Sequence, residues 1–173
     1  MPIDAGLMQA LNFTEEDLME NVAGRLSKRQ RALLSRRFLI MRAVALVILL
    51  VGLAAIALIF GSQAVRGGVI WLAVGAPFLV AWLFLARLIL HELEHALQDI
   101  QRHRVHAEIG VVHRITTKTP ENQTVRFVHV NERQFKVSTA VYEAFQEDVL
   151  YRVFYLPMSM MIVSAEPGQK PVE

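Results

Sequence analysis

The chain has 173 residues, of which 54% are hydrophobic and 20% charged, and its formal net charge is only +2. This near balance of acidic and basic side chains excludes a protein that binds nucleic acid through a broad basic surface. The absence of cysteine excludes a disulfide framework, a cysteine-ligated zinc site and thiol chemistry.

Residues 1–42 are predicted to form a cytosolic segment of amphipathic and basic helices. Thr14 and Asp17 have the spacing of a capping box, in which each side chain bonds the backbone N–H of the other residue at a helix start. Ser27 and Gln30 repeat this spacing. The second box is expected to open a helix that continues into the apolar region that follows.

Two apolar stretches come next, at residues 43–60 and 69–86, and each runs for 18 residues without a charged side chain. An α-helix of about 20 residues crosses the roughly 30 Å hydrocarbon core of a bilayer. Only eight residues, 61–68, separate the two stretches. The chain is therefore predicted to form a transmembrane helical hairpin over residues 43–90, with spans at 43–60 and 69–90.

Basic residues gather on one side of the predicted hairpin. Seven precede the first span, whereas the short loop holds only Arg66. Because Lys and Arg stay on the cytoplasmic side, both termini are expected in the cytoplasm. Each basic residue close to an anionic leaflet adds about 1 kcal/mol of attraction. The residues expected to contact anionic lipid headgroups are Arg25, Lys28, Arg29, Arg31, Arg36, Arg37 and Arg42.

The second apolar helix has no stop signal at the inner membrane surface, because the residues that follow it include neither Gly nor Pro as far as Val105. Residues 91–106 are therefore predicted to form a cytosolic helical stalk. An apolar stripe at this end of the helix predicts either packing against the helix of the first span or self-association. The stripe consists of Leu90, Leu93, Leu97 and Ile100.

One motif at the start of the stalk could carry chemistry. Residues 91–95 read H-E-L-E-H and match H-E-x-x-H, in which two histidines one turn apart on a helix bind Zn²⁺ beside a glutamate general base. A second glutamate inside the motif argues against catalysis, as does the shortage of chain for a third ligand and a cleft. We therefore expect no catalytic residue, cofactor or metal. His91 and His95 remain candidate metal ligands, with Glu92 as the base and Asp99 as a further ligand for an adventitious ion.

Beyond the stalk the pattern changes to the alternation typical of strands. Residues 107–166 are predicted to form a small closed or nearly closed β-barrel, OB-like or SH3-like, because closure removes the free edges of so small a sheet. Residues 167–173 are predicted to be a disordered tail. Within the barrel, Asn131-Glu132 is a predicted turn and Thr139 a predicted helix cap. The expected strands are residues 108–117, 125–130, 134–138, 149–156 and 159–165, with a helix at 139–146.

Aromatic residues in this domain raise the question of nucleic-acid binding, which OB barrels often perform. Phe127, Phe135, Tyr151 and Tyr155 are interpreted instead as core side chains of a small barrel. The acidic residues of the domain nearly balance its basic ones. No nucleic-acid partner is therefore expected.

Two groups of residues resemble uncharacterised bacterial two-span membrane proteins with a small C-terminal β domain. The first group is Asn12, Phe13, Thr14, Asp17, Leu18, Asn21, Gly24, Leu26, Ser27 and Gln30. The second is Phe135, Val137, Ser138, Tyr151, Arg152, Val153, Tyr155, Pro157, Ser159 and Ser164. The resemblance implies this architecture in a bacterial inner membrane, and it implies no activity. The architecture is also similar to membrane-anchored OB domains of the NfeD type, which are partners of membrane scaffold proteins.

These features together predict a membrane α+β protein that is not an enzyme. Its cytosolic β domain is expected to bind a protein partner or another copy of the chain, as an accessory subunit of a membrane complex. One alternative is a zinc-dependent membrane enzyme that uses His91, Glu92 and His95. Another is a small oligomeric channel, although the apolar spans lack the polar stripe that a water-filled pore needs.

Overall fold

The computed structural model of the chain shows helices together with one antiparallel sheet, which confirms the predicted α+β class. The chain divides into two compact units. The sheet unit combines Met1–Leu33 with Gln98–Glu173, and the hairpin unit is Leu34–Leu97. The structure describes residues 4–67 and 70–168, without the side chains of residues 64, 66, 67, 72, 92, 93, 95 and 96.

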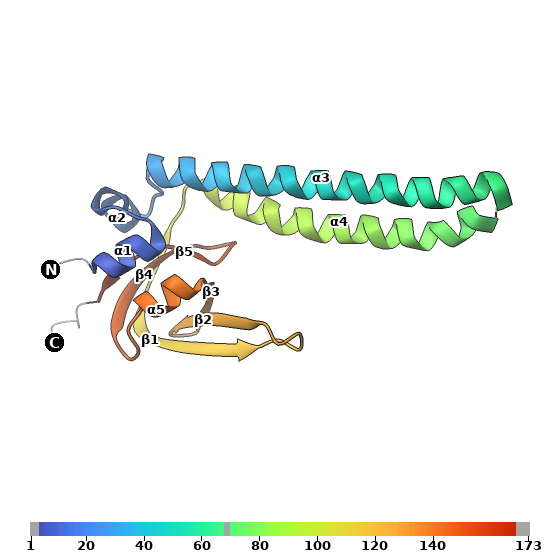
Figure 1. Ribbon diagram of the computed structural model, residues 1–173. Helices are drawn as coiled ribbons and strands as arrows, with labels where there is room; N and C mark the ends of the chain where they lie inside the picture. The colour runs from blue at the N-terminus through green and yellow to red at the C-terminus, as the bar shows by residue number, and fades with distance from the viewer. Residues whose placement is uncertain (1–3, 68–69, 169–173) are drawn as a thin grey trace. The chain divides into compact units, whose positions relative to one another are not determined.

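The sheet unit is built on five antiparallel strands in the order β3-β2-β1-β4-β5 (Figure 1). All five predicted strands are present, and their bounds differ from the prediction by at most two residues. Pro167, the first residue of the predicted tail, belongs to the last strand, whereas residues 169–173 lie outside the described part. The strands are β1 (His106–Lys118), β2 (Thr124–Val130), β3 (Arg133–Val137), β4 (Leu150–Leu156) and β5 (Met161–Pro167).

The long strand β1 joins two halves of the sheet. Residues 106–111 pair with β4, and residues 112–118 pair with β2. The sheet coils so strongly that the ring centroids of Phe135 on β3 and Tyr155 on β4 lie 5.1 Å apart. Among the described residues, however, β3 and β5 share no ladder, so the sheet is not closed. Of the two predicted forms, a closed or a nearly closed barrel, the closed form is therefore wrong. One physical reason is that helices bond to β5, as described below.

The core of the sheet unit contains three of the four aromatic side chains that the sequence placed there. Phe135, Tyr151 and Tyr155 are each at most 2% exposed, which confirms their interpretation as core residues. Phe127 is only half-buried, because it lies on the other face of the sheet opposite Ile115. Burial raises the pKa of Tyr155.

A short helix, α5 (Thr139–Ala144), connects β3 to β4 and adds Val141 to the core. Its N-cap is Ser138, whose hydroxyl accepts a hydrogen bond from the N–H of Val141 at 3.4 Å. The prediction that Thr139 caps this helix is therefore wrong by one residue. Two adjacent hydroxyl side chains offer the same capping chemistry, so the sequence alone does not separate them.

The turn between β2 and β3 requires a glycine on the neighbouring strand. Asn131 lies in this predicted turn at a φ of 52°, and its side chain donates hydrogen bonds to Ile109 O at 2.7 Å and Glu108 Oε1 at 2.8 Å. A Cβ atom at Gly110 would lie 2.2 Å from Asn131 Oδ1. Only glycine leaves room for the Asn131 side chain at this position, so Gly110 allows the turn to pack against β1.

Two short helices begin the sheet unit, α1 (Ala5–Leu11) and α2 (Glu15–Val22). The predicted capping box at the start of α2 is confirmed. Thr14 N donates to Asp17 Oδ2 at 2.9 Å, and Asp17 N donates to Thr14 Oγ1 at 3.3 Å. Gly24, at a φ of 77°, provides the left-handed residue that helices commonly need at their C-terminal end.

Helix side chains bond to strand β5. Asn21 of α2 donates to Ser164 Oγ at 2.7 Å, and Gln30 donates from Nε2 to the carbonyl of Val163 at 3.0 Å. Because the Gln30 amide is used here, the predicted Ser27–Gln30 box forms only in part: Ser27 Oγ accepts from Gln30 N at 3.0 Å. The Gln30 amide thus satisfies a backbone acceptor of β5, which is an edge strand of the sheet.

Two long helices, α3 (Lys28–Gly67) and α4 (Ile70–Arg102), form the hairpin unit, and the start of α3 and the end of α4 belong to the sheet unit. The predicted helix that opens after Ser27 and continues through the first apolar stretch is confirmed. By length and apolarity alone, Lys28–Gln63 and Ala73–His91 could each cross a membrane. At 1.5 Å per residue, α3 is about 60 Å long and α4 about 50 Å.

Within the hairpin unit, aromatic side chains of one helix lie over glycines of the other. Trp82 donates from Nε1 to the carbonyl of Leu49 at 3.1 Å, and a Cβ atom at Gly52 would lie 2.1 Å from the Trp82 ring. We call this contact of Trp82 with Leu49 and Gly52 the Trp82 seam. The rings of Phe60 and Phe78 stack at 5.4 Å between centroids. These contacts fix which residues of α3 face α4.

Candidate functional site

The first turn of α3 is organised by the buried carboxylate of Asp17, whose side chain is only 2% exposed. It accepts hydrogen bonds from Thr14 N, from the Ser27 hydroxyl and from Arg29 Nη1, the last at 2.6 Å. Burial by itself would raise the pKa of Asp17, but the hydrogen bonds from Ser27, Thr14 and Arg29 outweigh it and lower that pKa. Arg29 also bonds Asn12 Oδ1 at 3.0 Å, so it links the end of α1 to α3.

The last turn of α4 ends at Arg102, four residues before the predicted end of the stalk, and His103 follows it at a left-handed φ of 54°. His103 Nε2 lies 2.9 Å from Arg31 Nη1, and its Nδ1 contacts the carbonyl of Ile100. Because a guanidinium only donates, Arg31 is the donor in its hydrogen bond with Nε2. The His103 carbonyl accepts from Leu26 N at 3.3 Å.

Asp99 ties the end of α4 to the turn between β4 and β5. The residue is 1% exposed, and its Oδ2 accepts from Met158 N at 3.0 Å and from Ser159 N at 2.6 Å. The sequence offered Asp99 as a further ligand for an adventitious metal. In the structure both carboxylate oxygens instead accept hydrogen bonds from backbone N–H groups, since Met158 N also donates to Oδ1 at 3.1 Å.

These contacts, which we call the clasp, join the first turn of α3 and the last turn of α4 to the sheet. The clasp consists of Gln30 with Val163, Arg31 with His103, and Asp99 with Met158 and Ser159. The sequence gives no sign of it, because each bond connects residues at least 59 positions apart. Every member is in the sheet unit.

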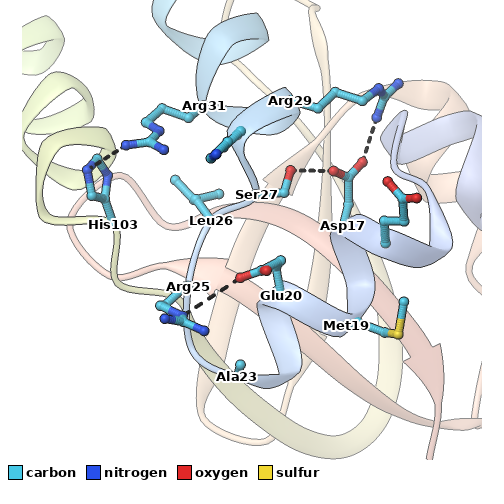
Figure 2. A pocket seen from close by; sticks show the side chains of 12 residues that line it. Asp17, Met19, Glu20, Ala23, Arg25, Leu26, Ser27, Arg29, Arg31 and His103 are labelled. Atoms are coloured by element: carbon cyan, nitrogen blue, oxygen red, sulfur yellow. Dashed lines mark hydrogen bonds and ion pairs between the residues drawn. The ribbon is translucent and has the colours of Figure 1, made fainter.

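A groove of about 830 Å³ lies between α2, the start of α3 and His103 (Figure 2). Four basic and three acidic side chains line it, and most of them bond one another: Arg25 with Glu20 at 3.7 Å, and Arg29 with Asp17. Arg31 bonds His103. Arg25, Arg29 and Arg31, three of the seven basic residues predicted to contact lipid, therefore already have protein partners. The groove therefore offers mixed charges to a ligand.

The H-E-x-x-H candidates lie on α4, which is helical throughout this region. His91 and His95 are thus one turn apart, as the spacing predicted. His91 is exposed, whereas the side chains of Glu92 and His95 lie outside the described residues. Zinc binding by these residues stays a prediction.

A second group of possible metal ligands, missed in the sequence, lies at the surface of the sheet unit. His113 Nδ1 is 3.1 Å from Asp148 Oδ1 and 3.7 Å from Glu147 Oε1. Glu147 also accepts from Arg114 N at 2.9 Å, and this backbone hydrogen bond lowers the pKa of its carboxyl. All three side chains are exposed and already paired. Their separation of 34 residues along the chain left no local motif to find.

Comparison with known proteins adds no further assignment. No protein-family model, curated protein or solved structure matches the chain. The resemblance to bacterial two-span proteins therefore stays a prediction.

Proposed function

We propose that the chain is a non-enzymatic integral membrane protein, in which α3 and α4 cross a bilayer and the sheet unit is a protein-interaction or assembly module. The observation that supports the anchor best is the exposed apolar surface of the hairpin unit. Val65 is 89% exposed, Leu58 73% and Ile70 69%. Apolar surface costs about 25 cal/mol per Å² in water, and lipid would remove this cost.

The distribution of charge favours an orientation with both termini in the cytoplasm. Arg36, Arg37 and Arg42 are exposed on α3 just before the apolar stretch, and Arg87 is exposed just after that of α4. Residue 28, in contrast, lies about 22 Å of helix before residue 43. Headgroup contact is therefore best supported for Arg36, Arg37 and Arg42, and the basic residues near α2 serve the sheet unit.

The anchor can be tested by labelling, because the chain has no cysteine of its own. Ser62→Cys places an exposed thiol near the end of α3, in the segment predicted to link the two spans, and Glu121→Cys places one in the exposed loop between β1 and β2. In intact bacterial cells, a membrane-impermeant maleimide should label the first variant and should reach the second only after permeabilisation. Extraction of the protein into carbonate without detergent would contradict the anchor.

An exposed aliphatic stripe on the outer face of β1 supports an interaction role for the sheet unit. Ile109 is 53% exposed, Val111 39% and Ile115 40%, at alternate positions that point to one face. The half-buried Phe127 pairs with Ile115 on the same face. We infer that this stripe binds a protein, either another copy of the chain or a different subunit.

Cysteine cross-linking separates these two partners. If the stripes of two copies meet about a two-fold axis, Val111→Cys should form a disulfide-linked dimer in native membranes, and Glu121→Cys should not. A different subunit would give a larger adduct of defined mass with a bifunctional reagent. Ile109→Asp should abolish either product. A monomer with no adduct in native membranes would contradict the assembly role.

The strand order also supports the OB-like choice among the predicted barrel types. Three consecutive strands form a meander, β4 and β5 add to the far side of β1, and α5 lies between β3 and β4. A partly open five-stranded Greek-key sheet of this kind is typical of OB-folds. We propose an OB-like module whose β3–β5 seam stays open, a type of fold that by itself assigns no ligand.

A further inference from the structure

The turn between β4 and β5 is held by side chains from two different helices. Asp99 of α4 accepts the N–H groups of Met158 and Ser159, and Gln30 of α3 donates to the carbonyl of Val163. The turn itself contains Met160 at a left-handed φ of 51°. A non-glycine residue rarely adopts this conformation unless its surroundings enforce it. The two helix ends thus hold the two ends of one short segment.

The same two helix ends are bonded to each other. Arg31 of α3 donates to His103, which follows α4, and the chain just before α3 pairs with the chain just after α4. In that pairing Val105 N donates to Gly24 O at 3.0 Å. A shift of one helix end against the other must therefore break these bonds or move the segment that both ends hold.

Each helix is free of glycine and proline between the clasp and the Trp82 seam. On α3 this holds for residues 28–51, and on α4 for residues 78–102. Sharp kinks in helices occur almost always at such residues or at local defects of the hydrogen-bond ladder. Neither helix therefore contains, over these residues, a glycine or proline at which a sharp kink would be expected.

We propose that the β4–β5 turn is a conformational switch whose state is set by the packing of α3 against α4 at the Trp82 seam. When the seam is closed, Asp99 and Gln30 hold the turn in the observed form. When the seam is displaced, Asp99 leaves Met158 and Ser159, and the turn opens. This coupling goes beyond the anchoring role and needs only the folded chain, so it can fail while the anchor holds.

Two glycine substitutions on α3 provide a matched test. At Gly52 an added Cβ would collide with Trp82, whereas at Gly61 nothing lies within 4 Å. Trp71→Phe leaves Trp82 as the sole tryptophan, so its fluorescence reports on the seam of the full chain in detergent. Hydrogen exchange of the peptide covering residues 157–163 reports on the turn. We expect Gly52→Ala to shift the fluorescence and speed turn exchange about tenfold, and Gly61→Ala to do neither.

Asp99→Asn completes a double-mutant cycle. This variant alone should speed exchange of the turn, and Gly52→Ala should then add almost nothing, because the turn is already released. If Gly52→Ala prevents folding, Trp82→Phe removes the indole N–H bond to Leu49 with less change of volume. The proposal is overturned if Gly52→Ala shifts the Trp82 fluorescence, or Trp82→Phe removes the bond to Leu49, while the turn exchanges no faster than it does in Gly61→Ala. It is also overturned if the effects of Gly52→Ala and Asp99→Asn on exchange are independent.

Discussion

Asp17 combines almost complete burial with a full negative charge. Its carboxylate holds the start of α2 through Thr14, the start of α3 through Ser27, and the end of α1 through Arg29. A buried charge is tolerated when several donors satisfy it, and removing it leaves those donors unpaired. The arrangement of the three N-terminal segments therefore depends on this single side chain.

Asp17→Asn should destabilise the protein measurably. Hydrogen bonds to a charged group contribute about 1.5–3 kcal/mol, so we expect the free energy of unfolding to fall by about 2 kcal/mol. Denaturant titration of the full chain in detergent, followed by circular dichroism, measures this change. Glu16→Gln is the matched control, since Glu16 is the exposed neighbour of Asp17 on α2. Equal losses in the two variants would contradict the role of Asp17.

The pH dependence of stability gives an independent check on Asp17. Its pKa in the folded protein is lowered from the ordinary value of 3.8. The folded state therefore binds fewer protons, and the stability from Asp17 is present above that value and is lost as the pH falls through the lowered pKa. Acid titration of stability should show this loss in the native chain and in Glu16→Gln. An identical acid profile in Asp17→Asn would refute the assignment.

Gly110→Ala should displace the turn between β2 and β3 and destabilise the protein. The new Cβ would lie 2.2 Å from Asn131 Oδ1, and overpacking of this kind costs about 1–3 kcal/mol. Asn131→Gly removes the obstructing side chain and tolerates the positive φ at that position. The double variant should therefore lose less stability than the sum of the two single variants in thermal unfolding. Strict additivity would show that the two residues do not collide.

At the scale of elements, α2 is attached to β5 by one buried amide. Ser164→Ala should cost about 1–3 kcal/mol of unfolding free energy, because it leaves the Nδ2 group of Asn21 buried without its acceptor. Replacing both partners, as in Asn21→Leu with Ser164→Ala, should recover most of the loss, since no polar group is then stranded. Urea titration of the single and double variants measures both effects. If the double variant is less stable than Ser164→Ala alone, the unpaired Asn21 amide is not the cause of the lost unfolding free energy.

The elements that depend on local patterns could be predicted, and those that depend on distant partners could not. Alternation placed the strands, and the Thr14–Asp17 spacing placed the start of α2. Gln30 looked like half of a local capping box, but its amide bonds Val163, 133 positions away. Asp99 looked like a metal ligand because only its spacing from His91 was visible. The buried acceptor role of Asp99 depends on a turn that forms 59 residues later.

At the scale of the whole molecule, the proposed orientation across a bilayer rests on the placement of charge. Arg36, Arg37 and Arg42 precede the first apolar stretch, and the loop between the stretches carries only Arg66. Positive charge close to the ends of short spans sets orientation, whereas charge farther away has little effect. The three arginines are therefore expected to control topology, independently of the sheet unit.

Reversing this charge difference should invert the hairpin. In a variant that carries Gln at positions 36, 37 and 42 and the changes Gln63→Lys and Val65→Lys, the loop gains two positive charges and the flank loses three. A thiol introduced by Ser62→Cys should then be shielded from an impermeant maleimide in intact cells, whereas we expect the reagent to reach it in the parent chain. Lys118→Gln with Lys136→Gln also removes basic residues but does not change the residues that flank the spans in the sequence, so it should leave labelling unchanged. Labelling that persists in the reversed variant would show that something other than flanking charge, such as folding of the sheet unit before insertion, sets the orientation.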